Sequence, residues 1–159
     1  MDAKITVSNA AKASKKQKYE ELLPQIASLL EGESDLTAKM ANTVAVLKQN
    51  FDFLWVGFYV VKGRDLVLAP FQGALACFRI PFGKGVCGAA WRQKETLIVA
   101  DVSKFAGHIV CDSASKSEIV VPLISKADEV IGVLDIDSGV LNHFDQTDAG
   151  YLKKITALL

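Results

Sequence analysis

The chain has 159 residues, half of them hydrophobic, which is enough for one domain with a buried core. Lysine plus arginine and aspartate plus glutamate number 18 each, so no net charge attracts nucleic acid or an anionic membrane, and neither is expected as a partner. The longest apolar run, residues 53–61, is about half the length of a membrane-spanning helix. No apolar stretch of signal-peptide length opens the chain, so we expect a cytoplasmic protein with reduced cysteines.

The first third of the chain predicts two helices. Residues 1–13 show no periodicity and are expected to form a flexible arm. Ser14 and Gln17 form a capping box that begins the first helix, and Gly32 ends it. Asp35 can cap the second helix, whose apolar residues recur at helical spacing.

The rest of the chain predicts strands and a final helix. Five segments are typical of strands, the first two joined by a tight turn: residues 53–61, 66–71, 96–102, 118–124 and 129–137, with a further short strand before the glycines at 83–88. Asp145 or Thr147 can cap the final helix. Neighbouring strands joined by short turns indicate an α+β fold with a central antiparallel sheet flanked by helices, not a doubly wound parallel sheet.

The glycine-rich segment Gly83–Gly88 matches the pattern of a dinucleotide-binding loop. That function also needs a parallel strand–helix–strand unit and an acidic residue at the end of the second strand, and the sequence offers neither. A structural glycine turn followed by a short helix is therefore the better interpretation.

The three cysteines, Cys77, Cys87 and Cys111, allow three interpretations. They could be small buried side chains, or they could bind zinc together with His108, although their spacing lacks the close pairs of a structural zinc site. Alternatively, Cys111 is a reachable nucleophile, because it lies in the polar loop 103–117 where His108 or backbone amides could lower its pKa. Cys87, at the expected start of a helix, would gain similarly from exposed N–H groups.

Three carboxylates are expected to converge on one face of the sheet. Strand alternation places Asp135 and Asp137 on the same face. If residues 125–128 form the turn, antiparallel pairing places Glu118 opposite Asp135. Like charges opposite each other destabilise a sheet unless a cation lies between them, so the cluster indicates a cationic ligand. The alternative is that some of these acids reach solvent at a strand end.

Two aromatic residues, Trp55 and Tyr59, share one face of the first strand and belong either to the core or to the wall of a pocket. Their segment is one of five that resemble the free methionine-R-sulfoxide reductases, which are single GAF domains. The resembling segments are WVGFYV (55–60), APFQGALAC (69–77), RIPFGKGVCGAAW (79–91), ADVSKFAGHIVCDSASKSEIVVPL (100–123) and GVLDIDS (132–138). The resemblance implies one GAF domain over residues 14–159.

The resemblance also implies a reaction, the reduction of free L-methionine (R)-S-oxide to methionine. Cys111 would attack the sulfoxide, and Cys77 would resolve the resulting sulfenic acid as a disulfide. Cys87 would be a second resolving thiol or a pocket residue. The implied reductant is an external dithiol, thioredoxin by expectation, and no cofactor or metal is implied.

The remaining site residues follow from the same resemblance. Glu118, Asp135 and Asp137 would hold the substrate ammonium and supply a proton, while Trp55 and Tyr59 would enclose the S-methyl end of the substrate.

The alternative is a non-catalytic GAF module that binds an amino-acid-like ligand and signals through dimerisation. Sensory modules usually need an attached output domain, and one domain fills this chain, which favours the enzyme. A homodimer, in which the amino-terminal arm would be ordered, is left open.

Overall fold

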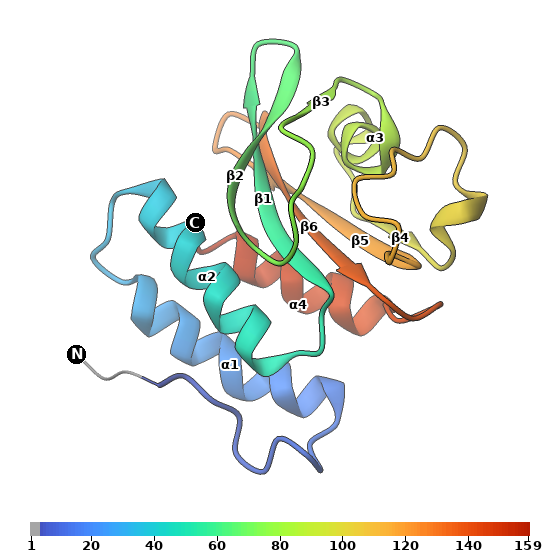
Figure 1. The fold of residues 1–159 in the computed structure, drawn as a ribbon. Coiled ribbons are helices and arrows are strands. Elements are labelled where there is room, and N and C mark those ends of the chain that lie inside the picture. Colours follow the sequence, from blue (N-terminus) through green and yellow to red (C-terminus); the bar gives the residue numbers. More distant parts are fainter. Residues whose placement is uncertain (1–3) are drawn as a thin grey trace.

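Four α-helices and a six-stranded sheet form the part of the chain that the computed structural model describes, residues 4–159 (Figure 1). The helices are α1 (Lys15–Leu30), α2 (Leu36–Asn50), α3 (Gly85–Gln93) and α4 (Gln146–Thr156), with a short 3-10 turn, η1 (Val102–Lys104). The strands are β1 (Trp55–Lys62), β2 (Asp65–Gln72), β3 (Arg79–Pro81), β4 (Leu97–Val99), β5 (Ser117–Ile124) and β6 (Val130–Ser138). Within this described range no helix combines the length and hydrophobicity needed to cross a bilayer.

Side-chain caps determine where the helices begin. Ser14 Oγ accepts the N–H of Gln17 at 3.2 Å, and Gln17 Oε1 accepts the N–H of Ser14 at 2.8 Å, which completes the predicted capping box. Asp35 caps α2, and Asp145, not Thr147, caps α4. Each cap satisfies N–H groups that the first turn of a helix leaves unpaired.

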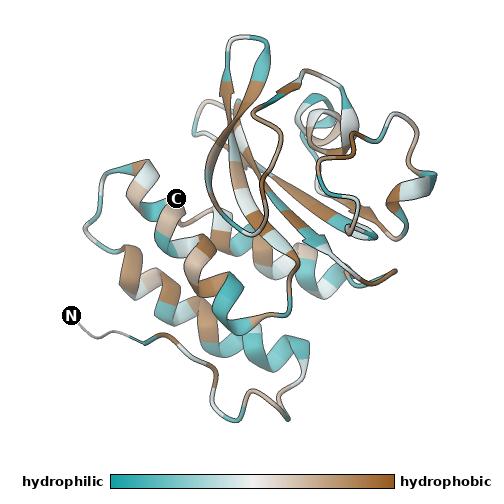
Figure 2. Cartoon of the chain, in the orientation of Figure 1, coloured by the Kyte–Doolittle hydropathy of each residue, from teal (hydrophilic) through white to brown (hydrophobic). Residues whose placement is uncertain are grey.

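The sheet separates two layers of the molecule. Its strand order is β3-β2-β1-β6-β5-β4 and every neighbouring pair is antiparallel, so the predicted α+β class is confirmed. Helices α1, α2 and α4 cover one face, and α3 with the loop before β5 covers the other (Figure 1). Hydrophobic residues are frequent along the strands and recur at intervals along the helices (Figure 2). Along β1, Val56 and Phe58 pack toward the three-helix layer, whereas Trp55 and Tyr59 pack toward α3.

The register of β5 against β6 differs from the prediction by two residues. Glu118 pairs with Asp137 and not with Asp135. Two single-residue shifts add up to this difference. The turn between β5 and β6 is one residue longer than predicted, since Ile124 pairs with Val130, and a bulge in β6 directly after Val130 adds the second residue. Because the side-chain period of a strand is two, an even shift leaves all three carboxylates on the predicted face.

The amino-terminal segment, expected to be a flexible arm over residues 1–13, contacts the body of the domain. Val7 is buried, and its N–H donates to Asn50 Oδ1 at 3.1 Å. Asn50 Nδ2 in turn donates to the carbonyl of Ile5 at 3.0 Å. Residues 1–3 lie outside the described residues. The central part of the segment is thus attached to the end of α2.

Candidate active site

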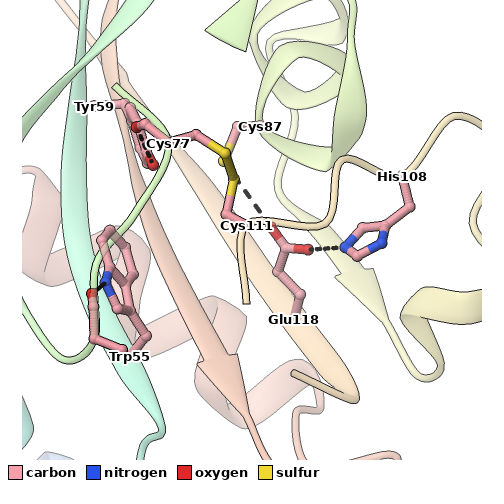
Figure 3. Close-up of a disulfide and its surroundings, with 8 residues drawn as sticks. Trp55, Tyr59, Cys77, Cys87, His108, Cys111 and Glu118 are labelled. Atoms are coloured by element: carbon pink, nitrogen blue, oxygen red, sulfur yellow. Dashed lines mark hydrogen bonds and ion pairs between the residues drawn. A yellow bond between two sulfur atoms is a disulfide. The ribbon is translucent and has the colours of Figure 1, made fainter. Parts of the chain in front are cut away.

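A disulfide joins Cys77 and Cys111 on the α3 side of the sheet, with the two Cα atoms 5.5 Å apart (Figure 3). Cys77 comes from the β2–β3 connection and Cys111 from the loop between η1 and β5, so the pair forms only when these two loops meet. Because of this bond, neither Cys77 nor Cys111 is a free thiol. The zinc site that would combine them with Cys87 and His108 is therefore not available in this form of the protein.

A cavity of about 40 Å³ lies beside the disulfide, room for a few water molecules. Of the predicted site residues, all but Cys77 line it, and Cys77 reaches it through its bond to Cys111. The lining residues are Trp55, Tyr59, Leu75, Ala76, Ile80, Gly85, Val86, Cys87, His108, Ile109, Cys111, Asp112, Ser115, Glu118, Asp135 and Asp137.

The two aromatic residues of β1 hold the loop that carries Cys77. Trp55 Nε1 donates to the carbonyl of Ala74 at 3.1 Å, and the Tyr59 hydroxyl donates to the carbonyl of Cys77 at 3.0 Å (Figure 3). Gly73 passes directly over the indole: a Cβ there would lie 2.5 Å from the Trp55 ring, and its φ of +141° favours glycine. Trp55 and Tyr59 therefore form a wall of the cavity and also position the loop.

Two of the three carboxylates are buried, and the third, Asp137, is half-buried on the same face of the sheet. Glu118 is 5% exposed and Asp135 is 7% exposed, so the alternative that these two acids reach solvent is wrong. Burial, with the charges of Asp135 and Asp137, raises the pKa of Glu118 well above its ordinary value. Burial raises the pKa of Asp135 to about 6, and burial with the charge of Asp135 raises the pKa of Asp137 to about 8.

The charge of this cluster has no side-chain counterpart. The lining residues of the cavity, among those the structure describes, include no lysine or arginine. Asp135 Oδ1 accepts no hydrogen bond from any described residue. A buried carboxylate oxygen without a donor is costly, so the cluster is suited to a cation that arrives from outside.

Two further polar residues reach the cluster from the loop before β5. Ser115 Oγ donates to Asp137 Oδ1 at 2.6 Å, and His108 Nε2 lies 3.8 Å from Glu118 Oε2. Burial lowers the pKa of His108, which favours the neutral imidazole. The sequence indicates His108 as a neighbour of Cys111 but carries no signal for Ser115, since an irregular loop has no period that predicts which side chains turn inward.

Cys87 lies inside the cavity beneath the disulfide. Its Sγ–H donates to Glu118 Oε1 at 3.9 Å, and its side chain is buried. Burial, with the charge of Asp135, raises the pKa of the Cys87 thiol well above its ordinary value. The prediction that the start of α3 activates this thiol is therefore wrong, because burial among carboxylates outweighs the N–H groups of the helix.

The sheet layers and the cavity above one face define a protein of the GAF class, and the family model of the GAF domain matches residues 31–159. GAF domain-containing protein A of Dictyostelium discoideum is 58% identical over 150 residues, 94% of each chain. The free methionine-R-sulfoxide reductase of Escherichia coli is 45% identical, and the match covers 92% of this chain and 88% of that protein.

Solved structures of the same fold support this assignment to the GAF class. The free methionine-R-sulfoxide reductase of Neisseria meningitidis, solved in complex with its substrate, superimposes with a TM-score of 0.89 at 53% identity, over 92% of this chain and 88% of that one. The chain belongs to the free methionine-R-sulfoxide reductase family of GAF-domain proteins.

Proposed function

We propose that this protein reduces free L-methionine (R)-S-oxide to L-methionine. The observation that carries the proposal is the Cys77–Cys111 disulfide beside an acid-lined cavity, because this bond is what the reaction would leave behind. The relatives named free methionine-R-sulfoxide reductases support the same substrate.

The chemistry uses the two linked cysteines. The Cys111 thiolate attacks the sulfoxide sulfur, the sulfoxide oxygen takes up protons, and methionine leaves while Cys111 becomes a sulfenic acid. The Cys77 thiol then condenses with the sulfenic acid, forming the disulfide and releasing water. In sum, one sulfoxide and two thiols give one thioether, one disulfide and one water, so the two electrons come from the cysteines.

The cavity offers a partner for each group of the substrate. The carboxylates of Glu118, Asp135 and Asp137 bind the ammonium, and one of the three carboxyl groups supplies a proton to the sulfoxide oxygen. The rings of Trp55 and Tyr59 enclose the S-methyl end.

The substrate carboxylate has its own partner at the start of α3. Gly85 and Val86 line the cavity there, and Lys84 at the N-cap gives their N–H groups no side-chain hydrogen bond. Free N–H groups at a helix N-terminus bind carboxylates.

Substrate binds the reduced protein. A cavity of about 40 Å³ is too small for an amino acid of the size of methionine sulfoxide. Reduction of the disulfide frees the loop that carries Cys77, and the cavity can then open. An external dithiol restores the thiols after each turnover; we propose thioredoxin, in a reducing compartment such as the cytoplasm, with no resident metal or cofactor.

A non-catalytic module that binds an amino acid would also use the acid cluster. The disulfide favours the enzyme, because ligand binding alone gives no reason for two cysteines from different loops to meet at the cavity.

The test is turnover of racemic free methionine sulfoxide with dithiothreitol, with both epimers separated by chiral chromatography. We expect the wild type to consume only the R epimer and Cys111→Ser to consume neither. If folded, reduced wild-type protein consumes neither epimer, the enzyme is excluded and the binding module takes its place.

A further inference from the structure

Cys87 and the carboxylates form a cluster that the proposed turnover does not fully explain. One donor atom from each of Cys87, Glu118 and Asp135 lies within 4.8 Å of the other two, and all three residues are buried. The reaction needs a cationic partner for the acids, but it gives the buried Cys87 thiol no step of its own. A thiol, two carboxylates and a nearby imidazole are donors that zinc commonly takes in proteins.

The distances suit a tetrahedral ion. Tetrahedral zinc holds sulfur and oxygen ligands about 3.5 Å apart, as follows from bonds of about 2.3 and 2.0 Å. Cys87 Sγ and Glu118 Oε1 are already 3.9 Å apart, so small side-chain rotations complete the geometry. On the other side of Glu118, His108 Nε2 lies 3.8 Å from Oε2 (Figure 3), outside the group of three donors, so a fourth ligand would come from solvent.

The orphaned oxygen of Asp135 is an independent indication of a ligand. The residue is 7% exposed and lines the cavity, and its Oδ1 has no hydrogen-bond partner among residues 4–159. A metal ion between Cys87, Glu118 and Asp135 would satisfy this oxygen and neutralise the cluster. With about 40 Å³ of space, the oxidised cavity admits an ion although it excludes an amino acid.

The geometry points to a binding site for a thiophilic divalent cation, Zn²⁺ or Cd²⁺, formed by Cys87, Glu118 and Asp135. The ion replaces the proton of the Cys87 thiol. It also takes the place that the proposed function gives to the substrate ammonium, and for that reason, which rests on the proposed function, it is an inhibitor and not a cofactor. The site itself depends only on the geometry.

The test uses the oxidised protein, because the Cys77–Cys111 disulfide leaves Cys87 as the one free thiol. Zinc binding is measured by competition with a metal indicator, and cadmium–thiolate bonding by its ultraviolet charge-transfer band. We expect one ion per wild-type chain and, in Cys87→Ser and in Asp135→Asn, an affinity at least tenfold lower. The cadmium band should be absent from Cys87→Ser.

Asp112→Asn is the matched control, since Asp112 lines the same cavity but lies outside the three donors. It should bind zinc within twofold of the wild type. Circular dichroism establishes that each variant is folded, and Glu118→Gln provides a second test of the donor set if Asp135→Asn does not fold. The site is excluded if oxidised wild-type protein takes up no ion, or if Cys87→Ser retains the wild-type affinity. Neither result would bear on methionine sulfoxide turnover, which is measured separately.

Discussion

Glu118 and Asp137 lie directly opposite each other on β5 and β6, although both side chains are acids. Asp135 stands two residues before Asp137 on the same face, and Ser115 is the hydroxyl that donates to Asp137. Like charges across a sheet lower the stability of the strand pair. The acid cluster at the cavity therefore lowers the stability of the ligand-free protein, as expected of a binding site for a positively charged ligand.

Asp137→Asn should increase the stability of the oxidised, ligand-free protein. The pKa of Asp137 is raised to about 8 in the folded state, so the folded state holds this proton more tightly than the unfolded state does. Its contribution to stability is complete below about pH 4 and is lost as the pH rises through about 8. Asparagine carries no charge, so above pH 8 the variant should be more stable by on the order of 2 kcal/mol.

The measurement is urea denaturation at pH 4.5 and 8.5, with a chelator present so that no metal contributes. Asp52→Asn, at an exposed carboxylate, should leave the free energy of unfolding nearly unchanged at both values. An Asp137→Asn variant that is less stable than the wild type at pH 8.5 would contradict the view that this half-buried charge is destabilising.

Cys77→Ser should separate the first chemical step from recycling. Cys111 can still attack one sulfoxide, so about one methionine per chain should form in a single turnover. Without Cys77 the sulfenic acid has no resolving thiol, and thioredoxin as the only reductant should not sustain turnover. Methionine is counted by chromatography, and the sulfenic acid is detected with a selective label. Full thioredoxin-dependent turnover would remove Cys77 from this role, and Cys87 would then be tested.

N-acetylation of the substrate should abolish its reduction. The acetyl group removes the positive charge that Glu118, Asp135 and Asp137 are proposed to bind, and leaves their carboxylates without a cationic partner. We expect the rate with N-acetylmethionine (R)-S-oxide to be at least a hundredfold lower than with the free amino acid. Comparable rates for the two substrates would show that the acid cluster does not recognise the ammonium.

Gly57→Ala should destabilise the protein. A Cβ at Gly57 would lie 2.4 Å from both the Trp55 ring and Phe71 Cβ, which is too close for any contact. The indole must then move, at a cost of about 1–3 kcal/mol, and the loop that Trp55 holds should move with it. Tryptophan fluorescence and urea denaturation measure both effects.

The matched control is Gly150→Ala, at an exposed position of α4 where a Cβ meets nothing within 4 Å. Alanine is the better helix former, so this variant should be more stable by up to about 1 kcal/mol. If the two alanine variants change stability equally, the close packing around Trp55 has no energetic consequence.

Local interactions allowed much of this structure to be predicted from the sequence. The capping box at Ser14, the cap at Asp35 and the two-residue turn between β1 and β2 depend only on near neighbours along the chain. The same holds for the alternation that places Asp135 and Asp137 on one face, because it is a property of a single strand.

The tertiary structure alone decided the features that depend on how distant segments meet. A turn one residue longer than expected and a bulge in β6 together moved the partner of Glu118 from Asp135 to Asp137, and no local pattern marks a bulge. The environment of Cys87 also depends on the fold: the helix start predicts a more acidic thiol, whereas burial beside Glu118 and Asp135 raises its pKa.

One physical cause separates the features that the sequence predicts from those that only the fold decides. Backbone conformation and side-chain periodicity follow from interactions over a few residues, which the sequence states directly. Burial, pairing register and electrostatic coupling depend on which segments pack together, as when loops 34 residues apart bring Cys77 to Cys111. The sequence therefore determined which residues could do chemistry, and the fold decided which of them share a cavity and in what protonation state.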